Sequence, residues 1–341
     1  MLSNKKREFC PLWLVVALDI LLVGVTLLVF AFFHHALPAW KSERELQAYL
    51  AQQSLETPAI QEAESEIDVT TEPGFRTPWQ EKFADHFTEQ VEITDHSYTS
   101  PEVSVTIETV VEKLNGHTIT YYVANVYVAS LDNFNTYTAY DQIRPYVAQK
   151  AEDMAEACNA IFAISGDYFS NQKNGFVIRN GQIYSNDRNK SMCALYSDGT
   201  METYDRGTYK VEDIMAKDPV QVWNFGPVLL NPDGTARDKF NITSAIRSPN
   251  PRSAIGYFEP GHYLLVVVDG RQNHSYGMTM PQLAQVFADR GCKIAYNLDG
   301  GGSAVALFGG KIYSKPSEKR DIADMIIVTE AGYTPHKKEE K

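Results

Sequence analysis

The sequence predicts an α+β fold, namely a single domain rich in mixed β-sheet with two main helices, preceded by one transmembrane helix. Between residues 103 and 328, many short segments alternate apolar and polar residues and end at Gly, Pro, Asn or Asp. Only two segments of this region have the apolar spacing of an amphipathic helix. Near the N-terminus, residues 12–33 form an apolar run long enough to span the roughly 30 Å hydrocarbon core of a bilayer.

This apolar run predicts a signal anchor. Three basic residues precede it, and Asp19 is the one charge within it. The positive flank predicts a cytoplasmic N-terminus and an extracellular chain after about residue 36. Because no small-residue cleavage site follows the run, we favour an uncleaved anchor over a removed signal peptide. Residues 1–36 are therefore predicted to tether a single-pass protein to the cell membrane.

Residues 37–100 have the composition of a stalk. Residues 56–72 carry six acidic side chains and no Lys or Arg, which is too polar a segment to form a core alone. Four aromatic residues then recur at every fourth position from Phe75 to Phe87 and predict a short amphipathic helix. Because its polar positions are not basic, we expect this helix to pack on the domain rather than on lipid.

Charge and cysteine usage exclude some classes of protein. The net charge of -12 argues against a nucleic-acid partner, because a phosphate backbone requires a basic face. A small anionic ligand is still compatible, since a few arginines in a cleft set the local field. Three cysteines lie beyond the predicted anchor, and we expect buried free thiols, with a Cys193–Cys292 disulfide as the alternative.

The first half of the domain is predicted to be mostly sheet. Residues 103–111 and 118–128 alternate in polarity and should pair around the turn Asn115-Gly116. A helix is then predicted over residues 145–158, with proline at its start. Further strands are predicted over residues 160–165, 176–179, 182–185, 192–197, 201–204 and 220–230.

The second half of the domain repeats these signals. A hairpin is predicted to turn at Pro260-Gly261, between strands at residues 252–258 and 263–269. A helix over residues 279–289 then leads into a strand over residues 293–297. The predicted domain covers residues 101–332, and residues 333–341 form a charged tail.

The segment at residues 295–308 carries the strongest functional signal. An apolar run leads into Asp299, Gly300, Gly301, Gly302 and Ser303. Three consecutive glycines are expected where the backbone takes a positive φ or approaches a ligand closely. Such a turn can direct several N–H groups at one anion. The alternative is a tight turn between two strands with a capping aspartate.

Three more polar clusters follow or begin predicted strands. Binding groups gather in loops at strand ends, and a buried sheet does not hold unpaired charges. Taken singly, the aspartates can also be turn residues, and the arginine a surface strand residue. The clusters are residues 165–169 with Asp167, residues 250–256 with Arg252, and residues 268–271 with Asp269 and Arg271.

Several segments over residues 120–328 occur in an order shared with a known family. They are TYYVANVYV, AISGDYF, GFVIRNGQIY, FGPVLL, NPRSAIG, VVVDGR, MPQLAQVFADRG, AYNLDGGGS and the late Pro316-Ser317 with Arg320. Together they make roughly two thirds of the chain resemble a phosphodiester glycosidase domain. This family includes bacterial exopolysaccharide-related proteins. It also includes the enzyme that uncovers mannose 6-phosphate on lysosomal glycoproteins. Order across many motifs is harder to obtain by chance than one glycine run.

The resemblance implies hydrolysis of a sugar 1-phosphodiester at the anomeric carbon–oxygen bond, as by an N-acetylglucosamine-1-phosphodiester glycosidase. Cleavage of a glycosidic bond uses a carboxylic acid and a carboxylate. We assign Asp299 and Asp269 as the catalytic pair and Asp167 as a binder of sugar hydroxyls. Because phosphate is a good leaving group, an arginine that stabilises its negative charge can replace part of the proton donation by a carboxylic acid.

The phosphate needs a fixed positive fork, which Arg252 supplies better than a lysine. Arg271 or Arg320 adds a second charge, and the amides of the triple glycine take the remaining phosphate oxygens. The predicted substrate-binding residues are Arg252, Arg271, Asn297, Gly300, Gly301, Gly302, Ser303 and Arg320. The expected partner is a phosphodiester-linked sugar or glycan of the cell surface or of an exopolysaccharide.

No cofactor is expected, and neither H-E-x-x-H nor C-x-x-C occurs, which argues against zinc. A calcium ion held by Asp299, Asp269 and backbone carbonyls is left open. A rival interpretation is a non-catalytic module that binds a cell-wall polymer or glycan. It is favoured by Asn125, where relatives commonly have Asp, and by Ala304, where they often have a hydroxyl residue.

Overall fold

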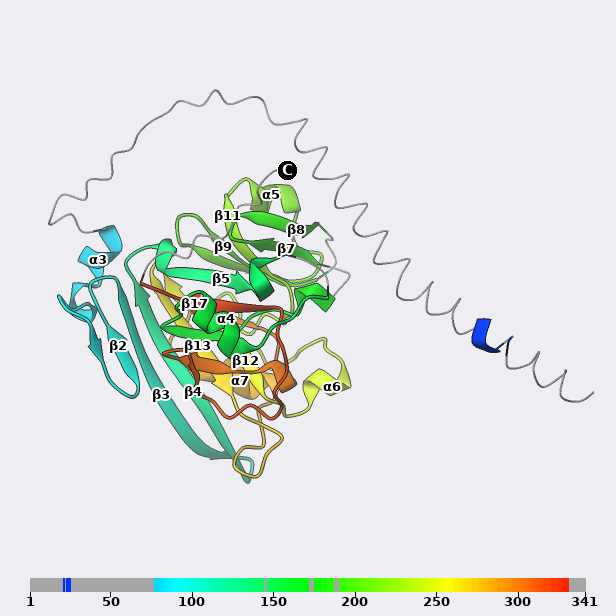
Figure 1. Ribbon diagram of the computed structural model, residues 1–341. Helices are drawn as coiled ribbons and strands as arrows, with labels where there is room; N and C mark the ends of the chain where they lie inside the picture. Colours follow the sequence, from blue (N-terminus) through cyan, green and yellow to red (C-terminus); the bar gives the residue numbers. More distant parts are fainter. Residues whose placement is uncertain are drawn as a thin grey trace, which may run out of the picture. The chain divides into compact units, whose positions relative to one another are not determined.

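A computed structural model of the chain describes residues 21, 23–25, 77–143, 146–171, 175–186 and 190–330 (Figure 1). The chain divides into two compact units, Met1–Asp68 and Val69–Lys341. The predicted span at residues 12–33, apart from the helical residues 21 and 23–25, lies outside the described residues, as do most of the stalk and the charged tail. Within the described part of the chain, no helix combines the length and the apolar character needed to cross a bilayer.

The second unit contains three sheets, and the strand pairs described in them are antiparallel. The first sheet has the order β1 (Glu92–Ile93), β2 (Ser97–Thr99), β3 (Val103–Leu114), β4 (His117–Val128), β13 (His262–Val268), β12 (Arg252–Glu259) and β14 (Ile294–Asn297). The second has the order β10 (Met201–Tyr204), β9 (Met192–Tyr196), β11 (Pro219–Trp223), β7 (Phe176–Arg179) and β8 (Gln182–Asn186). The third has the order β16 (Lys311–Ile312), β15 (Ala306–Phe308), β6 (Phe162–Ser165), β17 (Asp324–Val328) and β5 (Phe134–Thr138).

The two faces of the first sheet belong to different cores, because successive side chains of a strand point to opposite faces. Leu265 and Val267 of β13 join a large core shared by all three sheets. Leu264 and Val266 pack instead with α7 (Met280–Asp289) on the other face. The outer faces of the third and second sheets are covered by α4 (Ala151–Ala157) and α5 (Val211–Met215). This arrangement confirms a sheet-rich domain with two main helices, α4 and α7.

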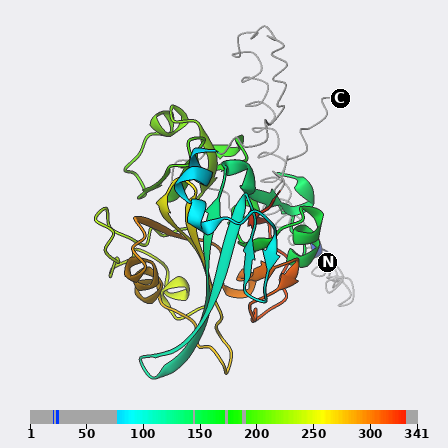
Figure 2. The same ribbon diagram turned by 90° about the vertical axis from the view of Figure 1, so that its left-hand side faces the viewer.

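β3 and β4 form the long hairpin that the sequence predicts, paired from Val103 with Val128 to Leu114 with His117. Both turn residues take positive φ, as a two-residue hairpin turn requires. The tip of this hairpin projects beyond the other strands in both views (Figures 1 and 2). The loop after β13 accompanies it there, because Tyr276 donates its N–H to the carbonyl of Thr118.

The helix predicted at residues 279–289 is confirmed. Thr279 is its N-cap, and Gln282 completes a capping box by accepting from the Thr279 N–H. The predicted docking of the aromatic segment is confirmed as well, although the helix, α3 (Pro78–Lys82), is short. Phe83, which follows it, is buried against Tyr127.

Two predicted elements have the wrong length. α4 begins at Ala151 rather than at residue 145, since Tyr146 takes a φ of 60° that a right-handed helix does not permit. β11 ends at Trp223 rather than at residue 230, because the N–H of Asn224 leaves the ladder to bond a carboxylate, that of Asp167. The expectation about the cysteines is confirmed: Cys158, Cys193 and Cys292 are buried free thiols, with no Cys193–Cys292 disulfide.

Candidate active site

The loop after β14 is the place where the four polar clusters meet. The N–H of Asp299 donates to the carbonyl of Gly166 at 2.9 Å, and that of Gly301 to the carbonyl of Pro251 at 2.9 Å. Gly270 packs so tightly on the segment that precedes β12 that a Cβ there would lie 2.7 Å from the nitrogen of Pro251. The sequence therefore identified four loops that the fold brings together.

The triple glycine is required by its surroundings. A Cβ on Gly300 would lie 2.6 Å from the carbonyl oxygen of Pro251, and Gly301 takes a φ of 63°. The Gly301 N–H is occupied by Pro251, so it is not one of the predicted phosphate donors. Within residues 190–330, the N–H groups of Gly300 and Gly302 have no hydrogen-bond acceptor. These two amides leave the turn able to bind an anion.

Asp299 is the half-buried carboxyl of this turn. Burial is the largest cause, and together with the charges of Asp167 and Asp324 it raises the pKa of Asp299 to about 7, against the lowering effects of Ser303 and Arg320. A carboxyl with a pKa near 7 exchanges a proton readily at neutral pH. Asp299 therefore has the properties of a general acid.

A buried charge cluster lies behind Asp299. The carboxylate of Asp324 accepts from the Asp167 N–H at 2.6 Å and from Arg179 Nε at 2.6 Å. Asp167 accepts from Arg179 Nη2 at 3.2 Å and from the Asn224 N–H at 2.7 Å. All three charged side chains are fully buried, so two acids share one base. Burial and the Asp167 charge raise the pKa of Asp324, against the attraction of Arg179.

The guanidinium of Arg252, which we expected to bind the substrate phosphate, is occupied by backbone carbonyls. Its guanidinium donates to three backbone carbonyls, those of Met278 at 2.9 Å, Ile246 at 2.7 Å and Ser248 at 2.9 Å. Burial, and then the charge of Arg271, lower its pKa to about 10. Arg252 thus ties the end of α6 (Ser244–Arg247) to the segment before α7, and its backbone, rather than its guanidinium, lies against the glycine turn.

Arg271 and Arg320 are the arginines beside the triple glycine. The Arg271 guanidinium would lie 3.3 Å from a Cβ on Gly301, and that of Arg320 3.1 Å from one on Gly302. Both side chains are about half exposed, at 46% and 48%. Glu318 lies between them, 3.6 Å from Arg271 and 2.8 Å from Arg320. The cluster carries one net positive charge next to the free amides.

Asp269, at the end of β13, is buried, and its partners come from outside the glycine turn. Its Oδ2 accepts from the Tyr122 hydroxyl at 2.9 Å and is 3.0 Å from His274 Nε2, while Oδ1 accepts from the Lys315 N–H at 3.0 Å. The carboxylates that raise the pKa of Asp299 are Asp167 and Asp324, not Asp269. The predicted pair Asp299 and Asp269 is therefore not the pair that is electrostatically coupled. Among the described residues, no group of three or more His, Cys, Asp or Glu is arranged to hold a metal ion.

The two remaining predicted residues are buried. Asn297 Nδ2 donates to the carbonyl of Gly226 at 2.7 Å and to that of Leu298 at 3.0 Å, so it positions the strand entering the turn. Its Oδ1 has no partner within the described residues. Ser303 hydrogen-bonds the carboxyl of Asp299. Both residues support the turn from inside.

Sequence reasoning missed Arg179, Asp324, Glu318 and His274. A charged residue at the end of an apolar strand is a signal for a buried ion pair. Arg179 ends the segment FVIR, and Asp324 begins the segment DMIIV. Asn125 loses its significance, since it bonds His262 at 2.8 Å and pairs with Leu264, away from the strand end that leads into Asp269.

The sequence was compared with protein-family models and with known proteins. A family model described as phosphodiester glycosidase matches residues 158–329, half of the chain. A SPbeta prophage-derived uncharacterized protein, YomE, of Bacillus subtilis is 26% identical over 185 residues, which are 52% of this chain and 29% of that protein. The match thus spans less than a third of the length of that relative.

Solved structures show the same fold. The catalytic domain of zebrafish N-acetylglucosamine-1-phosphodiester alpha-N-acetylglucosaminidase, auto-inhibited by its pro-peptide, has a TM-score of 0.56 at 21% identity, covering 71% of this chain and 88% of that one. A hypothetical protein from Synechocystis has a TM-score of 0.51 at 14% identity, covering 71% of this chain and 64% of that one. By the match to its family model, the chain belongs to the phosphodiester glycosidase family.

Proposed function

We propose that the protein is a membrane-anchored extracellular hydrolase that cleaves a sugar 1-phosphodiester in surface glycan or exopolysaccharide metabolism. The family and the name of the zebrafish structural neighbour support a glycosidase acting on such a bond. The observation that carries the proposal is a half-buried Asp299 of raised pKa beside the unpaired amides of the glycine turn. The apolar run at residues 12–33 supports the anchor.

In this proposal the phosphate lies between the glycine amides and the guanidinium groups of Arg271 and Arg320. Water adds to the anomeric carbon, the bond from that carbon to the phosphate oxygen breaks, and the leaving phosphomonoester takes the proton of Asp299. The proton lost by the water goes to solvent, from which Asp299 is reprotonated. Charge grows on the leaving phosphate, so fixed cations and a neutral acid favour the transition state over the ground state.

Turnover tests this function directly. The purified full-length chain should release a reducing sugar and a phosphomonoester from an N-acetylglucosamine 1-phosphodiester. No turnover, together with retained binding of the diester, would favour the non-catalytic glycan-binding module instead. If the chain shows neither turnover nor binding of any sugar 1-phosphodiester, both the hydrolase and the binding module are contradicted.

The pH dependence of turnover follows from Asp299. Its pKa of about 7, raised above the usual carboxyl value, keeps the acid form dominant below pH 7. We expect kcat/KM to be level below about pH 6 and to fall about tenfold per pH unit above about pH 8, because the ionised carboxyl cannot donate and repels the anionic substrate. A pH–rate profile in constant ionic strength checks this. A rate that rises through pH 7 would make Asp299 a base and contradict the proposal.

Glu318 competes with the substrate phosphate for the two arginines. Glu318→Gln is therefore expected to lower KM for the diester about two- to fivefold, the worth of an exposed ion pair. Steady-state kinetics at low salt measures the change, and Glu152→Gln on the exposed face of α4 is the matched control. An increase in KM would show that Glu318 holds the arginines in place for the substrate rather than competing with it.

A further inference from the structure

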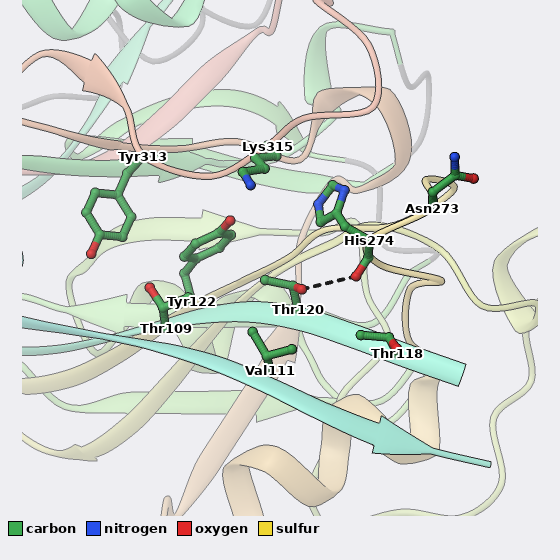
Figure 3. A pocket seen from close by; sticks show the side chains of 9 residues that line it. All are labelled: Thr109, Val111, Thr118, Thr120, Tyr122, Asn273, His274, Tyr313 and Lys315. Atoms are coloured by element: carbon green, nitrogen blue, oxygen red, sulfur yellow. Dashed lines mark hydrogen bonds between the residues drawn. The ribbon is translucent and has the colours of Figure 1, made fainter. Parts of the chain in front are cut away.

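An open pocket of about 590 Å³ lies beside the projecting part of the β3–β4 hairpin (Figure 3). Three segments that are distant in sequence build it: the hairpin, the loop after β13 and the segment after β16. Figure 3 shows the rings of Tyr122 and Tyr313, the amine of Lys315 and the ring of His274 gathered above the strands. Its lining residues are Thr109, Val111, Thr118, Thr120, Tyr122, Asn273, His274, Tyr313 and Lys315.

The hairpin contributes a polar face to this pocket. Thr109 pairs with Tyr122 and Val111 with Thr120, so alternate residues of both strands share one side. The face has two threonine hydroxyl groups on β4 and one on β3, where a strand covered by a core would carry apolar residues. Val111 at the edge is 64% exposed, whereas Thr120 and Tyr122 are 8% and 5% exposed, so the outer part of the face is open to a ligand and these two residues form its floor.

Aromatic and cationic groups face these hydroxyls. The ring centroids of Tyr122 and Tyr313 are 5.6 Å apart at an interplanar angle of 81°, which offers one edge and one face to a ligand. The ammonium of Lys315 makes no ion pair with the described residues. Concave sites that combine aromatic rings with a few placed polar groups bind small polar molecules. Rings, hydroxyls and one unpaired cation suit a sugar that carries an acid.

The pocket adjoins the candidate active site through the loop after β13. Asp269 lies directly behind its wall and is bonded there by Tyr122, His274 and the backbone of Lys315. Two residues later, Arg271 lies against Gly301 of the glycine turn. Gln272, which follows Arg271, donates from its side chain to the carbonyl of Lys315 at 2.6 Å and so fixes the far wall of the pocket to the same loop.

We propose that this pocket binds the group on the far side of the phosphodiester, and that this group is a sugar unit with an acidic substituent. The inference rests on the proposed function, since it places the pocket next to the cleaved bond. Tyr313 packs on the sugar ring above the buried Tyr122, and Lys315 binds the acidic group. Thr109 and Thr118 bind the sugar hydroxyls, because the Thr120 hydroxyl already donates to the carbonyl of His274. The acid is a carboxylate or a second phosphate, which share the same recognition chemistry.

Binding measured without turnover tests the pocket. The full-length chain is titrated calorimetrically with a uronic-acid disaccharide, a sugar 6-phosphate and a neutral disaccharide. We expect both acidic sugars to bind about tenfold more tightly than the neutral one, as one charge-assisted hydrogen bond predicts. The stronger of the two acidic probes identifies the acid.

Variants locate the binding. Lys315→Met should remove the preference for acidic sugars, Tyr313→Ala should weaken all three probes about tenfold, and the exposed Lys293→Met is the control that should change nothing. Equal affinity for acidic and neutral sugars, or an unchanged preference in Lys315→Met, would overturn the inference. Binding that depends on Lys315 without any turnover would sink the proposed function and keep the pocket as a sugar site, whereas turnover without such binding would do the reverse.

Discussion

Asp299→Asn is expected to lower kcat for a sugar 1-phosphodiester by about a hundredfold to ten-thousandfold, the usual contribution of a general acid. The asparagine keeps the size and the hydrogen bonding of a neutral carboxyl but has no proton to give. KM should change little, because the arginines and the free glycine amides that hold the phosphate remain. Initial rates across a range of substrate concentrations separate the two parameters.

The fold should tolerate this substitution. The pKa of the wild-type carboxyl is higher in the folded state than in the unfolded chain, so it costs stability that builds up as the pH rises toward 7 and is complete above it; a neutral asparagine removes that cost. Tm at pH 8 should therefore be no lower in the variant. Asp213→Asn, at an exposed position of α5, is the matched control for turnover. If Asp299→Asn keeps the kcat of the wild type, Asp299 is not the general acid of the reaction.

Arg179→Met is expected to lower the free energy of unfolding by about 3–5 kcal/mol. Arg179 is fully buried and is the base that Asp167 and Asp324 share, so its loss leaves two buried carboxylates without a counter-charge. Urea denaturation at pH 7 measures the change. The pair of Arg290 and Glu108, whose side chains are 25% and 63% exposed, is the comparison, and Arg290→Met should cost less than about 1 kcal/mol.

A double variant separates charge from packing. Adding Asp324→Asn to Arg179→Met removes one of the stranded acids, and we expect it to restore part of the lost stability. Lower pH should help the single variant for the same reason, because protonation neutralises the acids. If Arg179→Met is as stable as the wild type, the buried cluster does not depend on this arginine.

Local signals in the sequence were sufficient for much of the fold. The Asn115-Gly116 turn fixed the register of β3 and β4, and Thr279 with Gln282 marked the start of α7. Helix α4 was predicted too long because apolar spacing continued through residues whose backbone is set by contacts elsewhere. Tyr146 donates its N–H to the carbonyl of Ser170, a partner that no local pattern reveals.

The site was predicted as a meeting of loops, but not in its division of roles. Arg252 has the chemistry of a phosphate fork, yet carbonyls of Met278 and Ile246 occupy it, and sequence spacing does not show such contacts. Asp324 is the first residue of the otherwise apolar strand β17 and was not singled out, although it shares Arg179 with Asp167. Assigning roles among several aspartates required knowing which are buried and paired, and this depends on tertiary structure.

Hydrolysis in ¹⁸O-labelled water tests the central claim most directly. If Asp299 protonates the departing phosphate while water adds to the anomeric carbon, the phosphomonoester product keeps all of its original oxygens. Mass spectrometry of that product should therefore show no label. A phosphomonoester that carries one ¹⁸O would mean that water attacked phosphorus, and the protein would then be a phosphodiesterase that breaks the phosphorus–oxygen bond.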